Sequence, residues 1–235
     1  MLQQTQVVRV VPYYEAWLER FPSEDVLASA PVADVLRLWS GLGYNRRALA
    51  LQAACTAVVS GGWPRTVEGL LGLPGVGPYT AAAVASFAFG VQAAAVDTNV
   101  RRVIERVDRR RRRVPELARR ALALLPPGRA GDWNQALMEL GATVCTARAP
   151  ACEACPVASC RSRRRSHEWG PPVARRAGVR FQDTDRYVRG RIVAALVAGE
   201  MVPDGFEPAR LERALAGLAR DGLVVRDAAG VRLPG

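Results

Sequence analysis

The chain has 235 residues, of which 49% are hydrophobic, so it is long enough to bury one sizeable core and a small second module and too apolar to be disordered. Its 33 basic residues against 22 acidic ones give a formal net charge of +11, which favours a polyanionic partner, most often nucleic acid. No apolar run approaches the length of a membrane span and no signal peptide is visible, so we expect a cytosolic protein without a membrane partner.

Helical periodicity dominates the first two thirds of the chain. Apolar residues recur at helical spacing in residues 2–21, where Pro12 is expected to kink or divide the helix. No strand-like alternation occurs in this part, which predicts an all-α fold. The other segments predicted to be helical are residues 31–39, 46–59, 78–89, 97–107, 115–125 and 132–144.

The last quarter of the chain has a different pattern. Residues 166–180 are basic and contain proline and glycine, which predicts a linker. Residues 185–196 and 208–219 then predict two helices, and residues 223–233 predict a hairpin that turns near 227–230. Helix, helix and hairpin in this order indicate a small winged-helix-like module over residues 181–235.

A glycine-containing turn and an acid stand close together in the sequence. Leu73-Pro-Gly-Val-Gly77 lies between two helical segments, and its glycines allow a tight turn that brings backbone N–H groups to a phosphate oxygen. About 20 residues further on, Asp97 precedes an apolar-periodic helix. An aspartate there is most simply a helix N-cap, but it also suits the stabilisation of a cation formed when a glycosidic bond breaks.

Four of the five cysteines fall within 16 residues. Cys145, Cys152, Cys155 and Cys160 are separated by six, two and four residues, and such clustering in a cytosolic protein indicates a metal centre rather than disulfides. Four thiolates suit either tetrahedral zinc or a cubane iron–sulfur cluster, and the spacing alone does not separate the two.

Five motifs in this order resemble the bacterial adenine (A/G-specific) DNA glycosylases, a branch of the helix-hairpin-helix glycosylase superfamily. The motifs are Met-Leu-Gln-Gln-Thr-Gln at 1–6, Leu-Trp-Ser-Gly-Leu-Gly-Tyr at 38–44, Leu-Pro-Gly-Val-Gly at 73–77, Val-Asp-Thr-Asn-Val at 96–100 and the cysteine cluster. The resemblance implies a helix-hairpin-helix DNA-binding motif at 73–78 within a helical domain over residues 1–108. It also implies a helical iron–sulfur domain over 109–165 with a [4Fe–4S] cluster, although the last cysteine gap is one residue shorter than in the family.

The resemblance assigns roles residue by residue. Gly75 and Gly77 are expected to bind the phosphate beside the lesion through their backbone N–H groups. Asp97 is expected to stabilise the oxocarbenium-like sugar, with Asn99 hydrogen-bonding near it. Gln4 is expected to fill the gap left by the flipped base and so to offset part of the cost of extruding that base, which is a few kcal/mol. Residues expected to lie close to the base pair that is read are Leu2, Gln3 and Thr5.

Position 79 bears on the type of reaction. Superfamily members that also cut the strand carry a lysine there, whereas this chain has Tyr79 and no lysine at all, since every basic residue is arginine. No side-chain amine is available to form a Schiff base with the sugar. We therefore expect a monofunctional enzyme that leaves an abasic site, with Tyr79 either in the site or packing its helix.

Two features of the family are missing. The family's general-acid glutamate stands two residues before the Met of the first motif, and this sequence begins at that Met. We expect that the start has been assigned too late or the chain shortened; the alternative is an inactive relative. We also expect residues 1–235 alone to turn over feebly, because general acid catalysis is typically worth ~10² to 10⁴ in rate. Second, the residues after Cys160 are too few for the family's 8-oxoguanine-recognition domain.

The predicted function is therefore excision of adenine mispaired with guanine or 8-oxoguanine in double-stranded DNA, by a monomer that associates with the bacterial nucleoid through DNA. A mismatch thymine or uracil glycosylase shares the hairpin, the aspartate and the cluster, whereas Gln3, Gln4 and Thr5 favour adenine. Two further alternatives are a non-catalytic iron–sulfur lesion-binding protein and a basic zinc protein.

Overall fold

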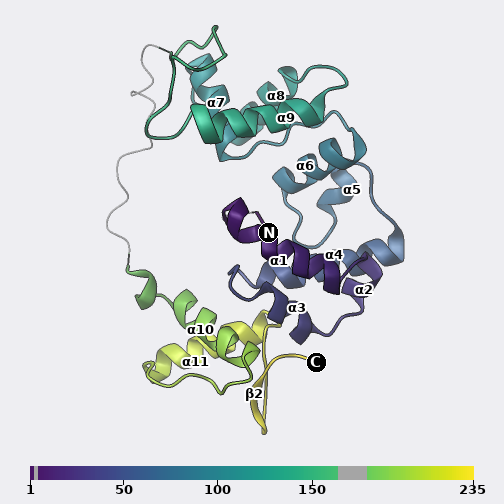
Figure 1. Cartoon of the computed structure of the whole chain (residues 1–235), viewed down its shortest axis with the longest axis vertical. Helices are drawn as coiled ribbons and strands as arrows, with labels where there is room; N and C mark the ends of the chain where they lie inside the picture. The colour runs from purple at the N-terminus through teal and green to yellow at the C-terminus, as the bar shows by residue number, and fades with distance from the viewer. Residues whose placement is uncertain (3–4, 164–178) are drawn as a thin grey trace. The chain divides into compact units, whose positions relative to one another are not determined.

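The computed structural model describes residues 1–2, 5–163 and 179–235 (Figure 1). It is mainly helical, which confirms the predicted fold class. By contacts, the chain forms two compact units, one of Met1–Trp63 with Ala177–Gly235 and one of Pro64–Arg176. The functional domain boundaries remain predictions. No helix among the described residues is long and apolar enough to cross a membrane.

The first unit joins the start of the chain to its end. Tight contacts pair α2 with α4 and α10 with α11. The two strands form the antiparallel hairpin that the sequence predicts, with Asp227 opposite Gly230 beside the turn. Its elements are α1 (Val7–Arg20), α2 (Glu24–Ala28), α3 (Val32–Trp39), α4 (Arg46–Gly61), the short 3₁₀ helix η3 (Phe181–Asp183), α10 (Asp185–Val197), α11 (Pro208–Arg220), β1 (Val225–Asp227) and β2 (Gly230–Arg232).

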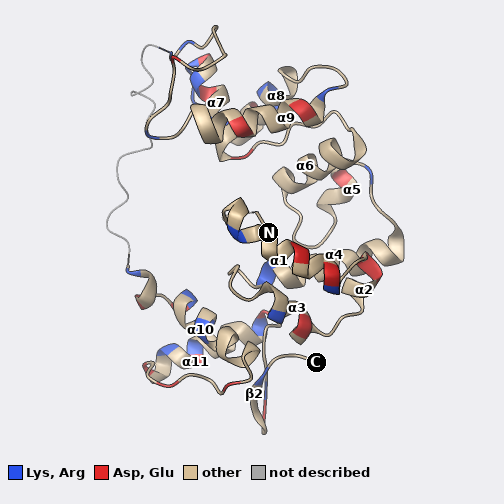
Figure 2. Cartoon of the chain, viewed as in Figure 1, with Lys and Arg blue, Asp and Glu red and all other residues tan. Residues whose placement is uncertain are grey.

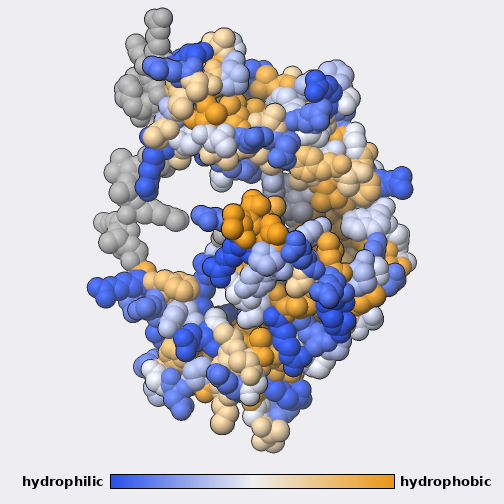
Figure 3. Space-filling view, in the orientation of Figure 1, coloured by the Kyte–Doolittle hydropathy of each residue, from blue (hydrophilic) through white to orange (hydrophobic). Residues whose placement is uncertain are grey.

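Helix α1 differs from its prediction. It begins at Val7 rather than near Leu2, and it continues through Pro12 without a break in the assigned helix. Proline removes one N–H and crowds the preceding turn, a cost of ~3 kcal/mol in a helix interior. Burial of Val10 and Trp17 in the core supplies the compensating free energy. In Figure 3 the beginning of α1 carries an exposed apolar patch that includes Val7 and Val8.

The C-terminal module shares a core with the N-terminal helices. Leu36 of α3 is fully buried in one cluster with Val188 and Ile192 of α10 and Leu218 of α11. The apolar residues that recur in 185–196 and 208–219 therefore form the faces of α10 and α11 that pack against α3. The sequence predicted the elements of this module but not the partner on which it packs.

The second unit contains α5 (Val67–Leu71), α6 (Pro78–Phe89), α7 (Thr98–Asp108), α8 (Val114–Ala123), α9 (Ala130–Glu139) and the π-helix η1 (Leu140–Val144). Helix α6 begins and ends where predicted and buries its alanine-rich faces. Asn134 is fully buried and ties α9 to the extended segment before α7, because its side chain accepts from the Ala95 N–H and donates to the Ala93 carbonyl. The helix predicted over 132–144 is observed as α9 followed by the π-helix η1, whose π geometry was not predicted. The short α5 is not among the predicted ranges.

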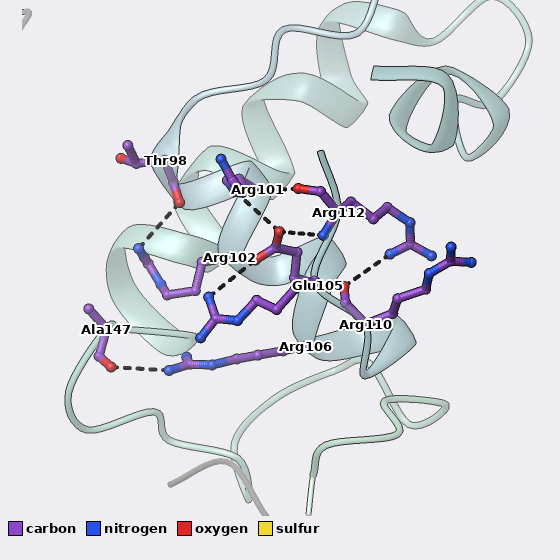
Figure 4. Close-up of polar contacts among 9 residues, drawn as sticks. Thr98, Arg101, Arg102, Glu105, Arg106, Arg110, Arg112 and Ala147 are labelled. Atoms are coloured by element: carbon purple, nitrogen blue, oxygen red, sulfur yellow. Dashed lines mark hydrogen bonds and ion pairs between the residues drawn. The ribbon is translucent and has the colours of Figure 1, made fainter. Parts of the chain in front are cut away.

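Five consecutive arginines at 109–113 follow α7, and such a run usually forms a solvated loop. The structure gives part of this run another role. Glu105 of α7 is 2% exposed and accepts hydrogen bonds from the Arg101 and Arg111 side chains and from the Arg112 N–H. The Arg112 side chain forms an ion pair with Asp108 at 2.7 Å. Figure 4 shows Arg101 and Arg112 on either side of Glu105. A buried carboxylate needs such partners, so part of the run closes the end of α7.

Candidate DNA-binding and catalytic site

The turn at Leu73–Gly77 combines a left-handed glycine with the N-terminus of a helix. Gly75 has φ +73°, a left-handed conformation that favours glycine, and Gly77 is the N-cap of α6. Neither amide has a hydrogen-bond acceptor in the part of the chain that the structure describes. A Cβ at Gly77 would meet no atom within 4 Å, so packing does not require glycine there. Both N–H groups lie at a helix N-terminus, where the helix dipole favours an anion.

Asp97 is the N-cap of α7, as its position in the sequence predicts. Its Oδ1 accepts from the Val100 N–H at 2.7 Å, and its Oδ2 accepts from Asn99 Nδ2 at 3.0 Å. The side chain is half-buried rather than enclosed. Because each carboxylate oxygen accepts more than one hydrogen bond, these two contacts fix the orientation of the group and leave acceptor capacity for a ligand. Capping and a role in catalysis are therefore compatible.

Tyr79, in the first turn of α6, lies within electrostatic reach of Asp97. Burial raises the pKa of Tyr79, and the negative charge of Asp97 raises that pKa further. The hydroxyl therefore stays neutral, and it contacts the Met138 sulfur at 3.5 Å. This sulfur contact shows that Tyr79 packs against α9. The structure thus brings the start of α6 and the start of α7 near one another within the second unit.

Arg102 extends the contacts of Asp97 towards the cysteines, and the sequence analysis did not identify it. Its guanidinium donates to Asn99 Oδ1 at 2.7 Å, to the Gly141 carbonyl at 2.6 Å and to the Cys145 carbonyl at 2.8 Å. A Cβ at Gly141 would lie 2.6 Å from the Asn99 Cβ, so only glycine lets η1 approach α7 this closely. Hydrogen bonds therefore connect Asp97, through Asn99 and Arg102, to the first cysteine.

Arg106, one turn further along α7, holds the beginning of the cysteine loop. Its side chain is almost fully buried, at 2% exposure, and donates to the carbonyls of Cys145, Thr146 and Ala147. Figure 4 shows the last of these contacts. It also contacts the Cys145 Sγ at 3.3 Å. A guanidinium with several donors in a fixed plane suits this cluster of carbonyls. No signal in the sequence marked Arg106, because it shares a polar face of α7 with Thr98, Asn99 and Arg102, and such a face is usually solvated.

The four predicted cysteine ligands line one small cavity of about 20 Å³, next to Arg106. No three His, Cys, Asp or Glu side chains among the described residues are arranged to hold a single metal ion. The cysteines nevertheless line one cavity, and a cubane cluster holds its sulfur ligands at separate corners rather than around one point. Four thiols facing one cavity, with a cation beside the first, fit the donor set of an iron–sulfur cluster.

The predicted base-reading residues belong to the other unit. Leu2 is exposed and its carbonyl accepts from the Thr5 N–H at 3.4 Å, whereas Gln3 and Gln4 lie outside the described residues. The second unit therefore contains the hairpin, Tyr79, Asp97, Asn99 and the cysteines, and the first contains Leu2 and Thr5.

Comparison with known proteins identifies the family of the chain. The family described as HhH-GPD superfamily base excision DNA repair protein matches residues 1–127, and the iron-sulfur binding domain of endonuclease III matches residues 145–159, ending one residue before Cys160. An adenine DNA glycosylase of Mycolicibacterium smegmatis is 45% identical over 246 residues, covering 98% of this chain and 83% of that protein. An adenine DNA glycosylase of Mycobacterium tuberculosis is 42% identical over 255 residues, covering all of this chain and 83% of that protein.

Solved structures show the same relationship. A non-covalent endonuclease III–DNA complex aligns with a TM-score of 0.62 at 28% identity, covering 69% of this chain and 79% of that one. A thermostable thymine-DNA glycosylase aligns with a TM-score of 0.62 at 33% identity, covering 66% and 76%. The cysteine loop carries a [4Fe–4S] cluster, the type found in this family. The chain therefore belongs to the HhH-GPD superfamily of base excision DNA repair proteins, within the adenine DNA glycosylase family, and is a DNA glycosylase that hydrolyses N-glycosyl bonds.

Proposed function

We propose that this glycosylase excises adenine mispaired with guanine or 8-oxoguanine and leaves an abasic site. The observation that carries the proposal is the carboxylate of Asp97, held by two hydrogen bonds and lying within electrostatic reach of the helix that begins at the hairpin. The relatives that match nearly the whole chain are named adenine DNA glycosylases. We also propose that the enzyme acts as a monomer and associates with the nucleoid through DNA.

In this mechanism the chain binds one DNA strand and stabilises a cation. The free N–H groups of Gly75 and Gly77 bind a backbone phosphate, while Leu2, Gln3, Gln4 and Thr5 contact the mispair and support the extruded nucleotide. The N-glycosidic bond breaks with its electron pair going to the base, which takes up a proton. Asp97 stabilises the positive charge on the sugar, and water then adds a hydroxyl to C1′. The cluster, when bound, crosslinks the cysteine loop, and no step passes through it.

Base release under single-turnover conditions tests the substrate class. With the chain in large excess over labelled duplexes, we expect release from A·G and A·8-oxoguanine and none from T·G or U·G. The excess protein makes a slow reaction measurable. Preferential release of thymine or uracil would instead establish the second candidate function, which the structural match to a thymine-DNA glycosylase supports. Tight binding to the A·G duplex without any base release would establish a lesion-binding protein.

The product is expected to be an intact strand with an abasic site. Strand cleavage by a β-lyase needs an amine that forms a Schiff base, and this chain contains no lysine side chain. Borohydride added during the reaction should therefore trap no covalent protein–DNA adduct, and strand breaks should appear only after alkaline treatment. An endonuclease III sample treated identically provides the positive control. A borohydride-dependent adduct with this chain would contradict the monofunctional assignment.

A further inference from the structure

A basic groove lies within the first unit, between the loop that connects α3 to α4 and helix α10. It has a volume of about 550 Å³. Four arginines and no acidic residue line it, which makes it the feature of this unit most suited to an anionic ligand. The arginines are Arg46, Arg47, Arg186 and Arg189. None of the roles described above uses this groove.

The loop side of the groove is built to expose an aromatic ring. Gly41 and Gly43 have positive φ angles, and Tyr44 itself has φ +49°, a conformation that bulky residues rarely adopt. Arg9 fixes the loop by donating to the Gly41 carbonyl at 2.7 Å, and the Trp39 indole donates to the Gly43 carbonyl at 3.0 Å. Tyr44 is 43% exposed as a result. Backbone strain at an exposed aromatic residue is typical of a binding surface rather than of a core.

The helix side comes from the C-terminal module. The Arg186 guanidinium lies 3.8 Å from the centre of the Tyr44 ring, and no carboxylate among the described residues forms an ion pair with it. Arg189 is occupied, because it binds Asp221 of the same module. Gly190, one turn after Arg186, has open space at its Cβ position, so no side chain fills the groove at this point. Basic residues recur along α10 in Figure 2.

We propose that this groove binds the sugar–phosphate backbone of duplex DNA, so that the C-terminal module contributes directly to DNA binding through Arg186. Arg46, whose side chain is 74% exposed, lies on the opposite wall; its ion pair with Asp221 at 3.7 Å offsets part of its charge, so Arg186 is the main cationic group of the groove. Guanidinium groups bind phosphate oxygens with two parallel donors, and an arginine stacked on an exposed ring is held ready for this at little entropic cost. The proposal rests on the proposed function only in taking duplex DNA as the substrate.

The salt dependence of DNA binding tests this assignment. The affinity of the full chain and its variants for an A·G duplex and a fully paired duplex is measured between 50 and 200 mM salt, independently of base release. For Arg186→Glu we expect weaker binding to both duplexes and a slope of log K against log salt that is smaller by ~0.9, the value for one lost phosphate contact. Arg186→Lys should keep the wild-type slope, because the charge is retained.

Arg191→Glu is the matched control, since Arg191 is an exposed residue of α10 outside the groove and the charge change is identical. Its slope should equal that of the wild type. Equal slope losses for Arg186→Glu and Arg191→Glu would overturn the proposal, because they would reflect only the field of the whole protein. Loss of the slope in Arg186→Lys would also overturn it, by assigning Arg186 to packing against Tyr44. Because the experiment measures only DNA binding, a negative result for the groove does not depend on whether the enzyme releases adenine.

Discussion

Asp97→Asn is expected to lower the rate of base release by about 10³-fold while leaving the fold and DNA binding intact. Loss of a preorganised group that stabilises charge in a transition state typically has an effect of this order. Asparagine caps helices as well as aspartate does, so the hydrogen bond from the Val100 N–H is retained, while the negative charge and the hydrogen bond that Oδ2 accepts from Asn99 Nδ2 are lost. Single-turnover base release, together with a thermal melt, measures both effects.

Asp132→Asn is the control for this substitution. Asp132 is exposed, lies in the same unit and pairs with Arg129 on the surface, so the same loss of charge should leave the rate of base release unchanged. A rate for Asp97→Asn within a few-fold of the wild type would mean that Asp97 serves only as a helix cap. The proposed mechanism would then be wrong.

Arg106→Met is expected to destabilise the protein by ~3 to 5 kcal/mol and to reduce its iron content strongly. The arginine is buried, and its removal leaves the carbonyls of Cys145, Thr146 and Ala147 without these donors. Methionine fills much of the volume but donates nothing, so the cysteine loop loses its attachment to α7. The melting temperature and the iron-to-protein ratio of the purified variant measure the two effects.

Arg119→Met controls for the loss of an arginine. Arg119 is exposed on α8 in the same unit, so its substitution should change stability by no more than about 0.5 kcal/mol and leave the iron content at the wild-type value. An Arg106→Met protein with full iron and an unchanged melting temperature would show that the loop is held by other contacts.

The candidate site was partly readable from the sequence. Gly75, Gly77, Asp97 and the four cysteines belong to short local motifs, because a turn, a cap and a ligand spacing each depend on neighbouring residues. The residues that connect these motifs were missed. Arg102 and Arg106 contact the cysteine loop about 40 residues away, and no local pattern encodes a contact at that separation.

The sequence by itself determined most of the helical segments, the hairpin, the glycine turn and the excess of arginine, because periodicity, turn chemistry and charge are properties of short stretches. Only the tertiary structure decided which distant residues meet. Helices α10 and α11 bury Leu36 of α3, part of the arginine run donates hydrogen bonds to Glu105 rather than to solvent, and Arg186 lies over Tyr44. The physical reason is that packing selects partners by shape and by the need to satisfy every buried polar group, and both conditions depend on atoms distant in the chain.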